Sequence, residues 1–428
     1  QIHVLHRKAS SARLFILNRP NKLNALNLSM IRNIGPQLKA WDVSTLAKVI
    51  ILKGVGRGKF CTGDDLLDIS KKAQAKNPNA LHFFQDKAAL VHMIANLKTP
   101  YITLLDGYAL GGSLGLFAHG PFRIATENSL FAVPEVELGA CLNAGSSFFL
   151  SRLDGELGTY LALTGHRLEG IDLFLCGIAT HYISSSRLPA LENKLIDLET
   201  IEHEIIQQVL EKFVERKEPS VISLSQDMKQ MIERCFAFNT VEDIIYALEK
   251  ERETPWIRET IQKLLAVSPT SSKVMLKVLR KAKGMPLNEC LTMEFDLIQK
   301  FLVTSDFHIG IDSTFNNKAP KKPLWQPPHI SDVSEDDIDR LYFTRSSPNE
   351  LRLPSPMDIK QYPYWRFALP SGDDIKSVLD GVSPEFGLGQ RLERTEEVID
   401  WFVARHKNKW GVREKVTEFL SRRAVSID

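Results

Sequence analysis

The sequence predicts an α/β fold, and three observations predict it. Apolar runs with the composition of buried strands, such as KVIILK and TPYITLLDG, are each followed by a turn that contains glycines. Segments with apolar residues at helical spacing lie between these runs. Strands and helices therefore alternate, which favours parallel strands joined by right-handed helical crossovers.

Local patterns place the first strands and the first helix. Residues 2–7 and 13–18 are predicted strands, closed by a short polar turn. A helix follows, with Asn27 as its expected N-cap and Pro36 as an interior residue that disturbs its regularity. Its apolar residues recur at helical spacing at Ile31, Ile34, Leu38 and Trp41.

The middle of the chain repeats the order of strand, turn and helix. The predicted elements are strands at 48–53 and 99–107, a helix at 81–97, a turn running directly into a helix at 108–120, and two short strands in FRIATENSLFAV. From about residue 145 to residue 310 the pattern is mostly helical.

Composition divides the chain into three predicted parts. Residues 1–190 form the α/β core, residues 191–330 a helical region that completes the same domain, and residues 331–428 a C-terminal extension. Proline and lysine content indicates a linker at 311–330, and a second proline-rich spacer spans 346–358. The extension is expected to end in a helical hairpin whose first helix is capped by Thr395.

Bulk properties exclude several classes of protein. Apolar residues make up 43% of the chain and charged residues 25%, which is typical of a globular protein, and no apolar run approaches the length of a membrane span. The net charge of +2 does not by itself demand nucleic acid or an anionic membrane. Five widely spaced cysteines without a CxxC motif are expected to be free thiols. A first residue other than methionine is consistent with import into an organelle.

Two of the glycine-containing turns could present backbone N–H groups to one anionic oxygen. Negative charge grows on the carbonyl oxygen when a thioester is attacked, and such donors stabilise it. The pattern alone is weak, because glycine after a strand usually marks only a tight turn.

Motifs in a fixed order make the pattern specific. NRPNKLNAL, GKFCTGDD, DGYALGGSLGL, RIATENSLFAVPE and LALTGHRLEGIDLFLCGIATHY are similar to segments of the crotonase (enoyl-CoA hydratase/isomerase) superfamily, and most resemble its 3-hydroxyisobutyryl-CoA hydrolase branch. AVSPTSSKVMLKVL, LTMEFDLIQ and SDFHIGI extend the resemblance to about residue 330. It implies a spiral of ββα units that holds an acyl-CoA thioester between the two turns, with no metal or other cofactor.

The resemblance also implies roles for single positions. The backbone N–H groups of Asp64 and Gly112 would be the two oxyanion donors, and Glu135 matches the catalytic glutamate. Asn143 stands where the hydrolases keep an aspartate, and Lys87 where they keep a glutamate that faces the substrate.

Departures from the family pattern cluster at these positions. The amide of Asn143 cannot exchange a proton, and the carboxylate of Asp64 opposes an oxyanion unless it turns away. Ser113 adds a Cβ within a glycine run, and Lys87 reverses a charge. Gly115 replaces the second glutamate of the hydratases, which agrees with the hydrolase branch. Together the four departures favour lost or weak catalysis.

Milder interpretations exist for three of these departures. Asp64 is also explained as a helix cap, since acids are favoured at a helix N-terminus. Asn143 is also explained as a turn residue that bonds the backbone, and Lys87 as a solvated helix residue.

The C-terminal extension resembles that of fungal mitochondrial members of the family. Its aromatic strip QYPYWRF suits either docking on a neighbouring surface or folding back on its own core. Basic residues outnumber acids seven to three between residues 401 and 428, an excess that suits contact with rRNA phosphates, and KAPKKPLW is a second short basic patch. The seven are Lys407, Lys409, Lys415, Arg405, Arg413, Arg422 and Arg423.

Two functions from different classes follow. The resemblance favours a hydrolase-derived structural component of the mitochondrial small ribosomal subunit, located in the matrix, with ribosomal proteins and rRNA as partners and no membrane association. The alternative is an active hydrolase that binds acyl-CoA and releases CoA from 3-hydroxyisobutyryl-CoA in valine catabolism. A protein that does both is a third possibility.

Overall fold

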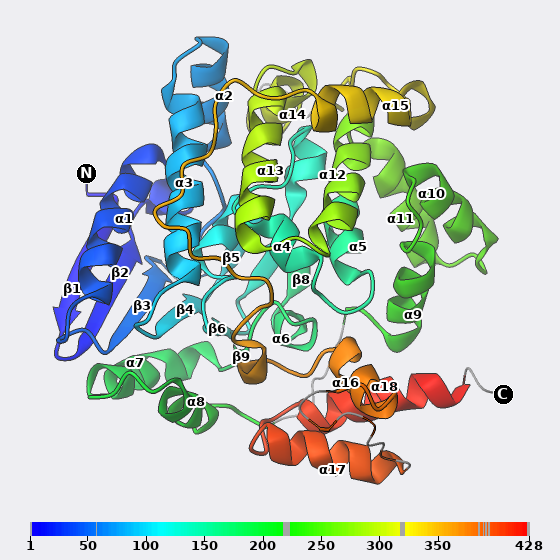
Figure 1. Cartoon of the computed structure of the whole chain (residues 1–428). Coiled ribbons are helices and arrows are strands. Elements are labelled where there is room, and N and C mark those ends of the chain that lie inside the picture. The colour runs from blue at the N-terminus through cyan, green and yellow to red at the C-terminus, as the bar shows by residue number, and fades with distance from the viewer. Residues whose placement is uncertain are drawn as a thin grey trace.

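The computed structural model describes most of the chain. The described residues are 2–56, 58–216, 223–316, 322–383, 386–387, 389, 392 and 394–425, with no side-chain description for 422–425. Figure 1 shows a central sheet with helices on both faces and the last helices, α16 to α18, below the core.

A six-stranded sheet forms the centre of the fold. Its strand order is β1-β2-β3-β4-β6-β9, in which β1 runs antiparallel to β2 and all other neighbours are parallel. The strands are β1 (Val4–Ala9), β2 (Ala12–Leu17), β3 (Val49–Gly54), β4 (Tyr101–Leu105), β6 (Phe122–Ala125) and β9 (His181–Tyr182). The predicted strands are therefore confirmed within two or three residues. β9 was not predicted, because a strand of two residues leaves no recognisable pattern in the sequence.

A second, three-stranded sheet stands beside the first. It has the order β5-β7-β8, formed by β5 (Tyr108–Leu110), β7 (Leu130–Ala132) and β8 (Leu168–Glu169). The prediction that residues 108–120 run directly into a helix is wrong, because β5 comes first and a 3-10 helix, Gly111–Leu116, follows it. The pairing of β5 with β7 holds the second glycine turn against the core.

Helices cover the six-stranded sheet on both faces. On one face α7 (Leu188–Ile196) and α8 (His203–Glu211) pack against side chains of β2, β3, β4 and β6. On the other lie α1 (Leu28–Asp42) and α3 (Asn79–Ala95). The predicted cap of α1 is confirmed, since the side chain of Asn27 accepts a hydrogen bond from the N–H of Met30.

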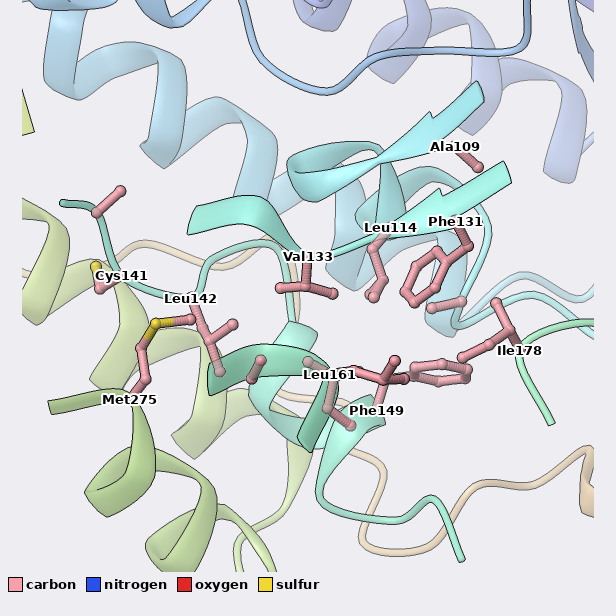
Figure 2. Close-up of a cluster of buried hydrophobic side chains, with 14 of the residues drawn as sticks. Ala109, Leu114, Phe131, Val133, Cys141, Leu142, Phe149, Leu161, Ile178 and Met275 are labelled. Atoms are coloured by element: carbon pink, nitrogen blue, oxygen red, sulfur yellow. The ribbon is translucent and has the colours of Figure 1, made fainter. Parts of the chain in front are cut away.

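The helical half of the chain packs against this core (Figure 1). It contains α2 (Leu66–Gln74), α4 (Ser146–Leu150), α5 (Leu157–Thr164), α6 (Asp172–Leu175), α9 (Gln226–Cys235), α10 (Val241–Lys250), α11 (Pro255–Ala266), α12 (Pro269–Ala282), α13 (Leu287–Phe301) and α14 (Ser305–Phe315). The predicted linker at 311–330 begins too early, because α14 continues to Phe315. Figure 2 shows Phe131 of β7 and Val133, which follows that strand, in one apolar cluster with Leu161 of α5 and Met275 of α12.

The aromatic strip of the extension folds back on the core. The hydroxyl of Tyr362 donates to the carbonyl of Gly120, and the ring of Phe367 lies 4.9 Å from that of Phe122. Upstream, the carbonyl of Met357 accepts a hydrogen bond from Nε2 of His92 on α3. Of the two alternatives for this strip, the structure therefore shows the intramolecular one.

The end of the extension is a helical unit. It contains α16 (Gly372–Leu379), α17 (Thr395–Arg405) and α18 (Val412–Val425), preceded by α15 (Glu335–Ile338) near the start of the extension. Thr395 is the first residue of α17 and Arg394 occupies the cap position, so the predicted cap was one residue late.

Much of the basic excess in the tail is used internally. Lys409 is buried and pairs with Glu211 at 2.9 Å, and Lys415 pairs with Asp154. Arg413 bonds two acids of α17. These three charges are therefore poorly placed for rRNA, contrary to the expectation from sequence. The side chains of 422–423 and the first four residues of KAPKKPLW, 318–321, lie outside the described residues.

Candidate functional site

A cavity of about 490 Å³ lies between the two glycine turns and the helices α13 and α14. Asp64, Gly112, Glu135 and Asn143 all line it, so the fold brings together four of the positions singled out from sequence. Its described lining ends at Phe315, and none of the lining residues comes from the C-terminal extension.

The two glycine turns are held side by side by backbone pairing. The N–H of Cys61 donates to the carbonyl of Tyr108 at 2.6 Å, and the N–H of Leu110 donates to the carbonyl of Cys61 at 3.1 Å. Gly63 has φ of +92° and lies so close to Leu110 that a Cβ would meet its carbonyl oxygen at 2.7 Å. Glycine is therefore required there by conformation and by space.

An ion pair crosses the site between these turns. Nζ of Lys87 lies 2.5 Å from Oδ1 of Asp64 and 2.8 Å from Oδ1 of Asn143. Both charged side chains are 2% exposed, and Asn143 is also buried. A Cβ built on Gly112 would lie well under 3.0 Å from both Lys87 and Asp64, so these two side chains fill the space beside its backbone.

This geometry overturns the milder interpretations of three positions. Lys87 is buried on α3 rather than solvated. Asp64 caps no helix, because Asp65 occupies the cap position of α2, and its carboxylate instead faces Lys87. The side-chain oxygen of Asn143 bonds Lys87, while its backbone carbonyl closes the turn to Ser146. Three apparent defects are therefore one hydrogen-bonded unit.

Glu135 is not part of this hydrogen-bonded unit, and its carboxyl has a raised pKa. It lies in the 3-10 helix Pro134–Leu138, is buried, and has an Oε2 atom with no hydrogen-bond partner among the described residues. Burial raises the pKa of its carboxyl to about 8, with the nearby Asp64 adding to the rise and Lys87 opposing it. At neutral pH the group is mostly an uncharged acid, which serves poorly as a general base.

We expect Glu135 to make stability fall as pH rises. Its pKa is 4.5 when unperturbed and about 8 in the folded chain, so its contribution is complete below 4.5 and lost by about 8. Between pH 5 and pH 9, Glu135→Gln should lose roughly 3–4 kcal/mol less free energy of unfolding than the natural chain. Denaturant titrations at both pH values measure this, with the exposed Glu233→Gln as control. Parallel pH profiles of the natural chain and Glu135→Gln would contradict it.

Ser113 and Gly115 lie in the 3-10 helix that follows β5. Ser113 is fully buried, and its hydroxyl has no partner among the described residues. A Cβ on Gly115 would lie 2.7 Å from both Ala144 and Val91. A second glutamate does not fit at this position without displacement of α3 or of the loop that carries Asn143.

Glu294 on α13 belongs to the site and was not singled out from sequence. Its two carboxylate oxygens accept hydrogen bonds from the N–H groups of Gly145 at 2.7 Å and Ser147 at 2.8 Å, so it fixes the loop that follows Asn143. Burial raises its pKa. The available signal was an acid within the apolar face of LTMEFDLIQ, between Leu291 and Ile298.

The described residues contain no cluster of His, Cys, Asp or Glu suited to a metal ion. All five cysteines are buried and unpaired. Among the described helices, none has both the length and the apolar character needed to span a bilayer.

Comparisons with known proteins place this geometry in context. Residues 12–342 match the family model described as Enoyl-CoA hydratase/isomerase. The chain is 36% identical to the small ribosomal subunit protein mS47 of Neurospora crassa, over 99% of this chain and 85% of that protein. It is 38% identical to the mitochondrial 3-hydroxyisobutyryl-CoA hydrolase of Homo sapiens, over 80% of this chain and 89% of that protein.

Solved structures show the same fold. A carnitinyl-CoA dehydratase from Mycobacterium thermoresistibile has a TM-score of 0.75 and 29% identity, and the match covers 83% of this chain and 100% of that chain. An enoyl-CoA hydratase from Rhodobacter sphaeroides has a TM-score of 0.73 and 24% identity, with 82% and 100% covered. The crotonase-like architecture expected from the motifs is thereby confirmed.

Proposed function

Because this chain belongs to the enoyl-CoA hydratase/isomerase family, we propose that it is a hydrolase-derived structural component of the mitochondrial small ribosomal subunit. The mitochondrial location predicted from the sequence agrees with the mitochondrial hydrolases among its relatives. Its partners would be ribosomal proteins and rRNA, and its pocket would not cleave thioesters at an enzymatic rate.

The observation that carries this proposal is the ion pair of Lys87 and Asp64. A thioester carbonyl has to place its oxygen near the N–H groups of Asp64 and Gly112, and side-chain atoms fill the space beside Gly112. Asn143 adds a second bond to Lys87 and cannot itself exchange a proton near neutral pH. Side chains that already satisfy one another therefore occupy the space beside one of the two oxyanion donors.

The extent of similarity gives independent support. The ribosomal relative aligns over 99% of this chain, including the C-terminal extension, whereas the human hydrolase aligns over 80%. None of the extension's residues lines the cavity, although Tyr342 of the extension packs against Phe301, which does. Residues beyond the hydrolase-like domain are thus better explained by assembly than by catalysis.

An active or partly active hydrolase is the second candidate. The cavity of about 490 Å³ persists, and Glu135 keeps the position of the catalytic glutamate implied by the family resemblance. An acyl-CoA that binds without turnover would be a ligand of the remaining pocket. A chain that both assembles into the ribosomal subunit and hydrolyses an acyl-CoA thioester would have both functions.

Two measurements on the natural chain test the proposal. Mitochondrial extract is separated on a sucrose gradient, and the chain is expected to sediment with the small ribosomal subunit at high recovery. The purified chain is then given 3-hydroxyisobutyryl-CoA with a thiol-reactive dye, and release of CoA is expected far below ordinary enzyme rates of about 1–10³ per second. Normal turnover without sedimentation would replace the structural function by the enzymatic one.

A further inference from the structure

Charge is distributed very unevenly along this chain. The first 63 residues contain eleven Lys or Arg side chains and one acid, Asp42, for a net charge of +10. The whole chain carries +2, so the remaining 365 residues together carry −8. Ordinary surfaces mix the two signs, and such separation points to an anionic partner at one end of the molecule.

The fold gathers these 63 residues at one end. They form β1, β2, α1 and β3, and Figure 1 shows this region as the blue end of the sheet, with β1 outermost. β1 pairs on one side only, with β2, so its other backbone edge faces away from the sheet.

Some of the basic side chains are neutralised or confined. Arg7 and Lys53 both contact Glu192 of α7. Arg13 is buried and donates to the backbone carbonyls of Ser10, Ala12 and, in the loop before β3, Leu46. Two more surface or half-buried pairs join Arg19 to Asp65 and Arg32 to Asp86.

Five lysines have no carboxylate within ion-pair distance in the described part of the chain. Lys8 and Lys39 are exposed, Lys48 is half-buried ahead of β3, and Lys22 and Lys59 lie toward the other end of the strands. Lys8 lies on the side of β1 that faces α1, because His6 shares its strand face and the ring of His6 is 5.7 Å from that of Trp41 on α1. Lys39 lies on the exposed face of the last turn of the same helix.

Local explanations cover single lysines but not the set. An edge strand is often protected from aggregation by a lysine, which accounts for Lys8. A cation near a helix C-terminus is favourable, which accounts for Lys39. Neither effect explains why 63 residues contain a single acid.

We propose that this N-terminal edge, with Lys8 on β1, Lys39 on α1 and Lys48 ahead of β3, binds the phosphate backbone of RNA. The biological identity of that RNA rests on the proposed ribosomal function, whereas binding itself is a property of this chain. The exposed face of α1 carries small, polar and basic residues, which suit phosphate and sugar contacts. These are Ser29, Arg32, Asn33, Pro36, Lys39 and Ala40.

Two neighbouring features show how far the basic surface extends and which other ligand could bind it. The loop between α7 and α8, which carries Asp197 and Glu199, lies beside Ser11, so the basic surface extends toward α1 rather than toward α8. Val43 and Leu46 are 79% and 72% exposed in the loop before Lys48, so an anionic lipid surface is the competing ligand. RNA is favoured because the apolar face of α1 is already buried in the core.

Direct binding to RNA tests the proposal without a ribosome. The natural chain is titrated into a labelled RNA duplex at several salt concentrations, and its affinity is expected to fall steeply with salt. Lys8→Glu, Lys39→Glu and Lys48→Glu combined should weaken binding at least about tenfold and reduce the slope of log K against log salt by about 3. Circular dichroism and thermal melting confirm that the variant is folded.

A matched variant controls for net charge. Lys250→Glu, Arg252→Glu and Lys263→Glu make the same charge change near α10 and α11, far from the blue end (Figure 1), and are expected to leave RNA binding almost unchanged. Equal losses for both triple variants would overturn the assignment of the surface. Binding to phosphatidylserine vesicles, with none to RNA, would overturn the choice of ligand.

Sedimentation separates this inference from the proposed function. If the natural chain sediments with the small subunit but does not bind the RNA duplex, the RNA surface fails alone. If the natural chain binds RNA but never sediments with the subunit, the ribosomal function fails and the RNA surface stands.

Discussion

Combined replacement of Asp64→Gly, Lys87→Glu and Asn143→Asp is expected to raise hydrolysis of 3-hydroxyisobutyryl-CoA by at least about 10²-fold over the natural chain. A single general acid or base contributes about 10²–10⁴ in rate, and these changes restore such groups while clearing the oxyanion space. Asp64→Gly removes the carboxylate from beside Gly112, and Lys87→Glu removes the ammonium from the same space.

The three changes must be made together because the side chains form one unit. Asp64→Gly alone leaves the Lys87 ammonium buried with only Asn143 as a partner, so it should gain little activity and lose stability. Asn143→Asp alone adds a carboxylate that Lys87 neutralises. Each single variant is therefore expected to stay within about tenfold of the natural rate, far below the triple variant.

Release of CoA, followed with a thiol-reactive dye at saturating substrate, measures the gain. Adding Glu135→Gln to the triple variant should abolish it, because the implied chemistry needs the catalytic glutamate together with the carboxylates that the three changes introduce. A folded triple variant with unchanged activity would show that the pocket is inactive for a reason other than the ion pair, and the proposed cause of inactivity would then be wrong.

The strands and the first helix were predictable because their signals are local. The cap at Asn27 and the apolar run of β3 depend on a few neighbouring residues, and both are confirmed. β8 and β9 have two residues each and form only by pairing with β7 and β6, so no local sequence pattern could predict them. The fold class was predictable from alternation and the ordered motifs, whereas these short strands were not.

The site was predictable as a set of positions but not as an arrangement. Sequence marked Asp64 and Lys87 as separate departures, 23 residues apart, and each had a harmless interpretation. Their ion pair depends on how α3 packs beside the first glycine turn, which is a tertiary property. Glu294 is farther still, 149 residues from the N–H of Gly145 that it fixes. Pairings over such separations leave no mark on either local segment.

Breaking the Lys87–Asp64 pair from one side is expected to destabilise the fold strongly. Both side chains are 2% exposed, and loss of one partner leaves the other charge buried without its counter-ion. Removing one member of a buried pair typically costs about 3–5 kcal/mol. We therefore expect Lys87→Met and Asp64→Asn each to lower the free energy of unfolding by about this amount.

The double variant distinguishes a pair from two independent residues. With both charges gone, no uncompensated ion remains. The free energy of unfolding lost in the double variant Lys87→Met with Asp64→Asn should therefore be smaller than the sum of the two single losses, by a coupling energy of about 2 kcal/mol or more. Urea titrations of the four chains give this coupling. The pair of Lys72 and Asp68 on α2, which is 31% and 44% exposed, provides a matched cycle expected to give less than about 1 kcal/mol.

The outcome bears on whether the ion pair keeps a thioester oxygen away from Gly112. A large coupling at Lys87 and Asp64 means that the two charges depend on each other, so neither can revert singly toward the hydrolase pattern without loss of stability. A coupling as small as that of Lys72 and Asp68 would mean that the two charges are effectively hydrated. The space beside Gly112 would then be open to a thioester oxygen, and the ion pair would not explain a loss of activity.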